Sequence, residues 1–169
     1  MRRAYLTSPT NLTAEMLTTY SASMRLLPFN VQGDLPAGVH RATRAEVLER
    51  FGHGTPERIR VTERLQRVLA LAEGTGKLER VFIWGSYVTD KPVPGDIDLF
   101  LVMAPDFVSN DCTDETHWVF DSATAERLLG ATVFWMTGGA GTQTTVASFL
   151  EQFQIRRDGG RRGIVEVLL

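Results

Sequence analysis

One stretch of the chain, residues 81–103, constrains the fold and the chemistry more than any other. Two apolar runs, at 81–84 and 99–103, have the length and composition of buried strands. Between them lie a Gly-Ser dipeptide, a polar connection with two prolines, and an Asp-x-Asp pair that opens the second run. The chain therefore brings a glycine–serine turn and two carboxylates to the ends of two successive strands.

Asp96 and Asp98 are two positions apart, a spacing that places both carboxylates on one face of a strand. Side chains at i and i+2 share a face and lie about 6.6 Å apart, at a rise of about 3.3 Å per residue. Such parallel carboxylates repel each other, and their burial is costly unless a cation lies between them. Mg²⁺ is commonly held by one or two carboxylates together with substrate phosphates. The pair therefore indicates a magnesium site, and a solvated strand end is the alternative interpretation.

Gly85 and Ser86 follow directly on the first apolar run. A glycine at this point permits a positive φ and a close approach of the backbone to a ligand. Ser86 and the amides after it can donate hydrogen bonds to phosphate oxygens. An ordinary turn at the end of a strand is the alternative. Lys91, in the connection that follows, is either a point charge for a phosphate or an exposed lysine of a loop.

Together these residues resemble the signature of the nucleotidyltransferase superfamily, which includes DNA polymerase β, the antibiotic nucleotidyltransferases and the minimal nucleotidyltransferase antitoxins. A Gly-Ser turn followed at this distance by an Asp-x-Asp strand is typical of that superfamily, and Gly85, Ser86, Asp96 and Asp98 match it position for position. The likeness covers most of the chain from Leu35 onward and looks like an uncharacterised bacterial branch. The resemblance implies an α+β fold, a mixed β-sheet flanked by helices.

The resemblance also implies a transferase that depends on Mg²⁺ or Mn²⁺ and moves a nucleotidyl group from a nucleoside triphosphate to an acceptor. Asp96 and Asp98 would be the catalytic, metal-holding residues, and Gly85 and Ser86 would bind the triphosphate. A protein side chain, RNA and a small molecule all remain open as acceptors, and a role in a toxin–antitoxin or defence system is compatible with each.

The superfamily usually places a third metal-binding carboxylate on the strand beside the Asp-x-Asp strand. The chain predicts a buried third strand at 131–136, and this segment carries no carboxylate. Asp121 or Glu166 would therefore have to supply the third ligand. The alternative function is a catalytically weakened nucleotidyltransferase fold that serves as a nucleotide- or protein-binding module.

Four arginines surround a Gly-Gly turn in residues 156–162, just before a predicted strand at 164–168. Guanidinium groups match phosphate oxygens in geometry and charge. We therefore expect Arg161 and Arg162 to bind the nucleotide. A charged loop with no ligand is the alternative interpretation.

Capping residues and apolar periodicity predict helices over 43–52, 55–73, 122–129 and 146–155, and residues 118–120 are predicted as a short strand. The helix over 55–73 carries basic residues opposite its apolar positions, and we interpret this face as solvated; binding of an acceptor or of nucleic acid is the alternative. The basic residues are Arg58, Arg60, Arg64 and Arg67.

The composition is that of an ordinary globular domain: 169 residues, 43% hydrophobic and 22% charged. We predict one domain over 39–169, preceded by an extended arm at 1–38 that contains a short helix near residues 14–20. The arm either packs across the domain or binds a partner. The net charge of −2 gives no overall attraction to nucleic acid or to an anionic membrane. A single cysteine fits a reducing cytosol, and no stretch is long enough to span a bilayer. We therefore expect a cytoplasmic protein.

Overall fold

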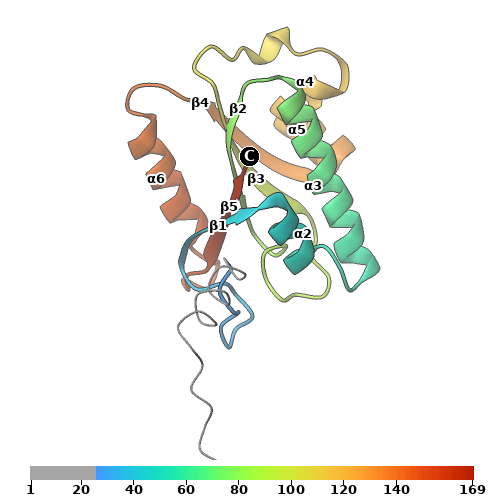
Figure 1. Ribbon diagram of the computed structural model, residues 1–169, viewed down its shortest axis with the longest axis vertical. Helices are drawn as coiled ribbons and strands as arrows, with labels where there is room; N and C mark the ends of the chain where they lie inside the picture. The colour runs from blue at the N-terminus through green and yellow to red at the C-terminus, as the bar shows by residue number, and fades with distance from the viewer. Residues whose placement is uncertain (1–25) are drawn as a thin grey trace, which may run out of the picture.

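The computed structural model of the chain describes residues 26–169, so the helix predicted near residues 14–20 lies outside the described part. A five-stranded mixed sheet stands between helices on its two faces, as Figure 1 shows. The α+β class and the mixed sheet expected from the sequence are thus confirmed. The strands are β1 (Gly38–Thr43), β2 (Leu78–Trp84), β3 (Ile97–Met103), β4 (Ala131–Thr137) and β5 (Gly163–Leu168).

The strands follow one another across the sheet in the order β1-β5-β2-β3-β4. β1 is parallel to β5 and β3 is parallel to β4, whereas β2 is antiparallel to both of its neighbours. β1 is a strand that the hydrophobic pattern of the sequence does not indicate, because Ala42 is its one buried residue. In this strand order β5 lies between β1 and β2, inside the sheet, although it follows all the other strands in the sequence.

The four predicted helices are present, with ends shifted by a few residues. The capping box predicted at Thr43 and Glu46 is formed, and Thr55 caps the next helix by accepting a hydrogen bond from the Arg58 amide at 3.2 Å. The helical elements are α2 (Arg44–Phe51), α3 (Pro56–Gly74), η1 (Ser109–Asp111), α4 (Asp114–Phe120), α5 (Ser122–Thr124), the π-helix η2 (Ala125–Leu129) and α6 (Thr142–Phe153).

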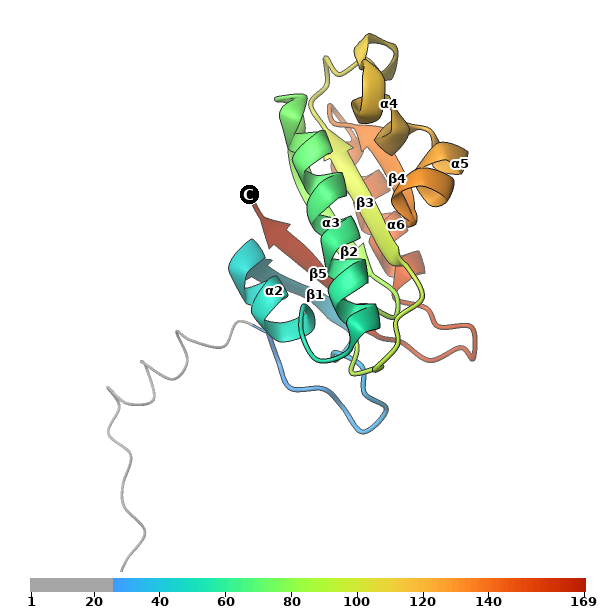
Figure 2. The ribbon, with the colours of Figure 1, turned by 90° about the vertical axis from the view of Figure 1, so that its right-hand side faces the viewer.

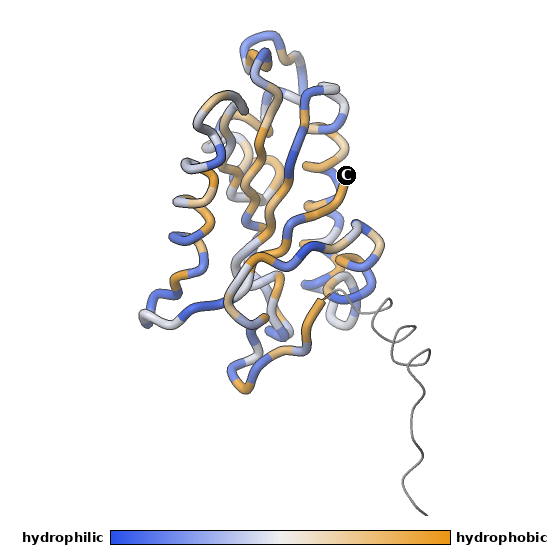
Figure 3. Tube along the Cα trace, turned by 60° about the vertical axis from the view of Figure 1, so that its left-hand side comes forward, coloured by the Kyte–Doolittle hydropathy of each residue, from blue (hydrophilic) through white to orange (hydrophobic). Residues whose placement is uncertain are grey.

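Helices cover both faces of the sheet, which explains why β2 and β3 read as continuous apolar runs rather than alternating ones. Figures 1 and 2 show α6 on one face and α2, α3 and the α4–α5 region on the other. Hydrophobic residues gather along the central strands in Figure 3. The larger core includes Phe51, Leu65, Leu69, Ile83, Leu99 and Leu101. The core under α6 includes Phe82, Trp84, Phe100, Val102, Val146, Leu150 and Ile164.

Residues 118–120 belong to helix α4, so the strand predicted there is wrong. A run of three apolar residues is too short to distinguish the two periods, and tertiary packing decides it. Phe120 packs against Phe107 at 4.6 Å and against Trp135 of β4 at 5.5 Å between ring centroids. The indole N–H of Trp135 donates to the Phe120 carbonyl at 3.0 Å, which fixes the end of α4 against the sheet.

β4 forms where the third strand was predicted, but it is less buried than expected. Ala131 and Val133 are its buried residues, while Phe134 is 45% exposed. β4 pairs with β3 and has no partner on its other side within residues 26–169. It is therefore an edge strand. Among the described helices, none has both the length and the apolar character needed to cross a membrane.

Candidate functional site

Gly85 ends β2 in a left-handed backbone conformation, with a φ of 81°. Trp84 pairs with Asp98 across β2 and β3, so the turn after Trp84 lies directly on this aspartate. A Cβ atom added to Gly85 would stand 1.8 Å from Oδ2 of Asp98. Both the backbone angle and the contact therefore require glycine at this position.

Arg58 of α3 fixes the turn after Gly85 through hydrogen bonds to its backbone carbonyls. Its Nη1 donates to the carbonyls of Phe51 and Tyr87, each at 3.0 Å, and its Nη2 donates to the carbonyl of Thr89. Arg58 is 7% exposed, and burial lowers the pKa of its guanidinium. The predicted solvated face of the helix is therefore wrong for Arg58, which ties α3 to the Gly-Ser turn.

The sequence contains a signal for this burial. Arg58 stands three and seven positions before Val61 and Leu65, two of the buried residues of α3, and so falls on its apolar stripe. Tyr87 packs inward, with no exposed surface and its hydroxyl 2.8 Å from Oγ1 of Thr62. Tyr87 is therefore part of the core and is not free to stack on a nucleobase.

Asp96 and Asp98 lie together at the start of β3, Asp96 exposed and Asp98 half-buried. Burial and, second, the charge of Asp96 raise the pKa of Asp98 to about 6. Arg162 and Arg157 act in the opposite direction, which places their positive charges near the same carboxylate. The like-charged pair inferred from the spacing is therefore present, and arginines of a distant segment face it.

Asp98→Asn is expected to stabilise the metal-free protein near neutral pH. The folded pKa of Asp98 lies above the unfolded value, so its contribution to stability is present below about pH 4 and is lost as the pH rises through about 6. The variant should therefore gain on the order of 1 to 2 kcal/mol at about pH 7.5 and little at about pH 4. Urea unfolding in the presence of a chelator measures both values.

The control Asp106→Asn removes a carboxyl whose pKa is lowered by a hydrogen bond from Lys77, and it should give no gain in stability. An equal gain in both variants would contradict the raised pKa of Asp98.

An open cleft of about 600 Å³ surrounds the two aspartates. Three segments far apart in the sequence line it, at residues 32–34, 85–98 and 156–162. Its basic residues are Lys91, Arg156, Arg157 and Arg162, and its acidic ones besides the pair are Asp34, Asp90 and Asp158. The predicted residues Gly85, Ser86 and Lys91 are all part of the lining. The site thus joins negative and positive charges in one cleft.

The two arginines predicted to bind nucleotide have different positions. Arg162 lines the cleft, and its Nε is buried with no hydrogen-bond partner among the described residues. Arg161 is absent from the lining and pairs with Glu151 of α6 at 2.5 Å. Neighbouring residues of an extended segment point in opposite directions, so one of the two had to turn away. Arg157 takes the place expected of Arg161.

Asp34 is a cleft residue that no sequence pattern indicates. It is 5% exposed and forms an ion pair with Arg156, which also contacts Asp158 at 3.0 Å. The same segment reaches the Gly-Ser turn, where the Asp90 amide donates to the Gly33 carbonyl at 2.9 Å. The described part of the predicted arm, residues 26–37, therefore packs on the domain and connects two walls of the cleft.

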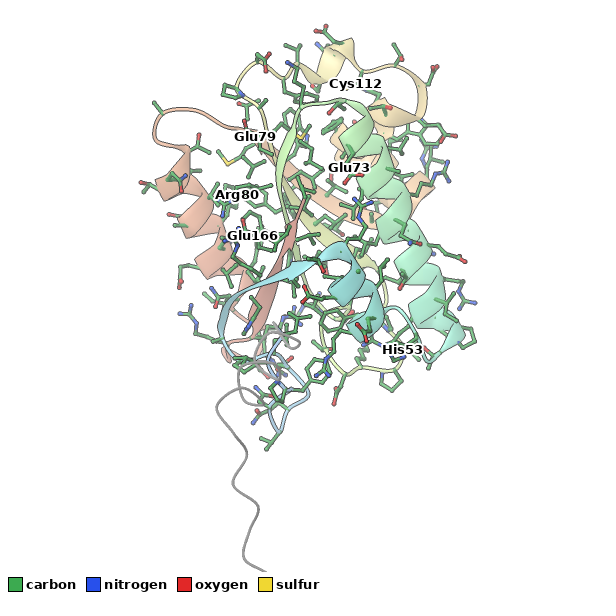
Figure 4. All side chains as sticks on the ribbon, viewed as in Figure 1. His53, Glu73, Glu79, Arg80, Cys112 and Glu166 are labelled. Atoms are coloured by element: carbon green, nitrogen blue, oxygen red, sulfur yellow. The ribbon has the colours of Figure 1, made fainter. Side chains whose placement is uncertain are left out.

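Neither candidate for a third carboxylate lies in the cleft. Glu166 forms ion pairs with Arg80 at 2.8 Å and Arg41 at 3.5 Å, and Figure 4 shows Glu166 beside Arg80. Asp121 is exposed and caps α5 by accepting from the Thr124 amide at 2.8 Å. No group of three or more acidic, histidine or cysteine side chains suited to a metal occurs in residues 26–169. The donors therefore fit a divalent cation held by two carboxylates and completed by the oxygens of a ligand.

A comparison with family models matches residues 27–168 to a family of unknown function, DUF6932. Neither the curated proteins nor the solved structures contain a match to this chain. All five strands and all three segments of the cleft fall within the matched range. The chain therefore belongs to DUF6932, a family of unknown function.

Proposed function

We propose that the cleft binds a nucleoside triphosphate with a divalent cation and that the protein transfers its nucleotidyl group to an acceptor hydroxyl. One observation carries the proposal: the half-buried Asp98 lies under the Gly85 turn, in a cleft that also contains an arginine with an unpartnered buried nitrogen. The resemblance of Gly85, Ser86, Asp96 and Asp98 to the nucleotidyltransferase signature supports the same conclusion.

The charges of the cleft suit such a ligand. Asp96 and Asp98 repel each other, and a cation between them would relieve the repulsion that raises the pKa of Asp98. Arg157 and Arg162 supply guanidinium groups for phosphate oxygens. A metal–triphosphate complex carries both the cation and the phosphates, so it complements both groups of residues.

The proposed chemistry assigns each residue a part. Ser86 and the amides of its turn donate hydrogen bonds to the phosphates, while Arg157 and Arg162 hold the end that leaves as pyrophosphate. Asp96 and Asp98 would hold the cation, which neutralises phosphoryl charge. The acceptor oxygen forms a bond to the α-phosphorus as the bond from that atom to the β-bridging oxygen breaks, and the hydroxyl proton is released to solvent.

A second candidate function is nucleotide binding without transfer. Thr132 is the residue of β4 that pairs with Asp98, and β4 carries no carboxylate at all. A cation held by two carboxylates alone would activate the acceptor hydroxyl poorly. A binding module of this kind would keep the affinity of the cleft for nucleotide and release no pyrophosphate.

Isothermal titration with ATP, GTP, CTP and UTP is expected to show Mg²⁺-dependent binding of at least one nucleotide, with a Kd on the order of micromolar. Asp96→Asn with Asp98→Asn should lose this binding, because two oxygen ligands lose their charge. The matched control is Asp106→Asn with Asp111→Asn, which makes the same change of net charge in a pocket remote from the cleft.

Three outcomes of the titration separate the candidates. Binding together with pyrophosphate release on addition of an acceptor supports transfer. Binding without release, for every class of acceptor, favours the binding module. No binding of any nucleotide to the wild-type protein would exclude both.

A further inference from the structure

A second charged groove, of about 440 Å³, lies between α3 and the π-helix η2. It opens on the face of the sheet that α3 covers, where Figure 2 shows α3 near the α5–η2 region. Four arginines and two glutamates line it together with a short uncharged stretch. These residues are Arg60, Arg64, Arg67, Arg127, Glu63, Glu126, Leu128, Leu129 and Gly130. The groove is therefore locally basic in a chain whose net charge is −2.

The arginines of α3 form a row along the groove. Arg60, Arg64 and Arg67 follow one another at intervals of about one helical turn, or about 5 Å along the axis. Arg60 and Arg67 contact glutamates that lie outside the groove lining, Glu57 at 2.8 Å and Glu115 at 3.0 Å. Such exposed pairs are weak and are readily exchanged for a ligand.

The two remaining arginines of the groove, Arg64 and Arg127, differ from this pair. Within residues 26–169, neither Arg64 nor Arg127 has a carboxylate partner within salt-bridge distance. The guanidinium of Arg64 lies against Gly130, where an added Cβ would stand 2.7 Å from its Cζ. Gly130 has a φ of 61°, so glycine is favoured there for two reasons. The turn into β4 thus leaves room for the Arg64 head group.

One end of the groove lies near the start of β3. Gly130 directly precedes Ala131, and Ala131 pairs with Ile97, the residue between Asp96 and Asp98. Neighbouring strands are about 4.8 Å apart, so the backbone at Gly130 lies beside the start of β3. The carboxylates themselves lie on the other face of the sheet, because Asp98 pairs with Trp84, which packs under α6.

We propose that this groove binds the phosphate backbone of single-stranded RNA. This binding role is independent of the proposed nucleotidyl transfer. A row of guanidinium groups suits repeated phosphates better than it suits one small anion. Leu128, 42% exposed, adds an apolar surface on which a base can pack.

An acidic protein segment is the other polyanion that a basic groove can bind. The geometry favours RNA, because the arginines of α3 are spaced by about one helical turn, which suits a regular row of phosphates, and guanidinium forks bind phosphate oxygens in pairs. The two glutamates of the lining repel phosphates, so the groove can neutralise only a few of them. The binding constant should therefore depend only modestly on salt concentration.

Fluorescence anisotropy with a labelled oligouridylate of about 12 nucleotides, without nucleotide or metal, tests the binding role. The wild-type protein should bind with a slope of log K against log [KCl] of about −2, which corresponds to about three neutralised phosphates. Arg64→Gln with Arg127→Gln should weaken binding about tenfold or more and should reduce the slope by about 1.4. Arg41→Gln with Arg44→Gln changes the net charge equally on exposed or half-exposed residues outside the groove, and should weaken binding less than about twofold.

The outcomes are distinct from those of the nucleotide titration. Asp96→Asn with Asp98→Asn should retain RNA binding while it loses nucleotide binding. A wild-type protein that binds RNA but no nucleotide would refute the transferase and leave the groove standing. No RNA binding by the wild type, or equal weakening in both arginine variants, would overturn the proposal. Tighter binding of a labelled polyglutamate peptide than of RNA would overturn it as well and would identify a protein ligand.

Discussion

Replacing Arg58 with methionine is expected to lower the free energy of unfolding by about 3 to 5 kcal/mol. Methionine can fill the apolar part of the space but donates no hydrogen bond. The carbonyls of Phe51, Tyr87 and Thr89 would then be left without the donor that they share, and unpaired buried polar groups cost about 1 to 3 kcal/mol each. Urea denaturation followed by circular dichroism measures the loss.

Arg60→Met is the matched control, because Arg60 lies on the same helix, is exposed, and forms an ion pair with Glu57 at the surface. We expect a change within about 0.5 kcal/mol for it. Arg58→Met should also weaken nucleotide binding beyond its effect on stability, since Arg58 holds the carbonyls of the turn after Gly85. Equal stability of the two variants would show that Arg58 does not anchor that turn.

Gly85→Ala is expected to abolish nucleotide binding and to destabilise the fold by about 1 to 3 kcal/mol. The alanine Cβ would stand 1.8 Å from Oδ2 of Asp98, so the carboxylate must move from its present position. The left-handed φ of 81° adds backbone strain for any residue with a Cβ. Titration with nucleotide and Mg²⁺ measures the binding, and thermal unfolding measures the stability.

Gly141→Ala separates these two causes. Its φ of 85° is nearly the same, but an added Cβ would have no neighbour within 4 Å. Gly141→Ala therefore has the backbone strain without the clash. It should lower the free energy of unfolding about as much as the strain alone does in Gly85→Ala, and it should retain nucleotide binding. If Gly85→Ala bound nucleotide as well as Gly141→Ala, the close contact with Asp98 would have no role in the site.

The centre of the candidate site could be predicted from the sequence because its geometry is local. Asp96 and Asp98 share a face by the period of a strand, and Gly85 is brought to them by the pairing of two successive strands. The other wall could not be predicted in the same way. Asp34 and Arg156 meet across 122 positions of the chain, and no local pattern encodes that contact.

Arg58 and Arg161 show two further limits. Arg58 was predicted to be solvated because of its charge, although it falls on the buried stripe of α3. The three backbone carbonyls that accept its hydrogen bonds explain why it is buried. Arg161 and Arg162 are equivalent as a sequence pattern. The direction of the chain before β5 decides that Arg161 contacts Glu151 and that Arg162 lines the cleft. Burial and side-chain direction therefore depended on tertiary structure.

The position of β5 has a consequence for folding. Strands β2, β3 and β4 are near one another in the sequence, but β1 reaches the sheet only through β5, in a register that pairs Gly38 with Gly163. Closing so long a loop is entropically unfavourable, and topologies with distant pairings fold slowly. The arginines that precede β5 arrive with it. A partly folded chain would thus hold the carboxylates without their basic counterpart, so the capacity to capture a ligand should appear only at the slow, final step of assembly.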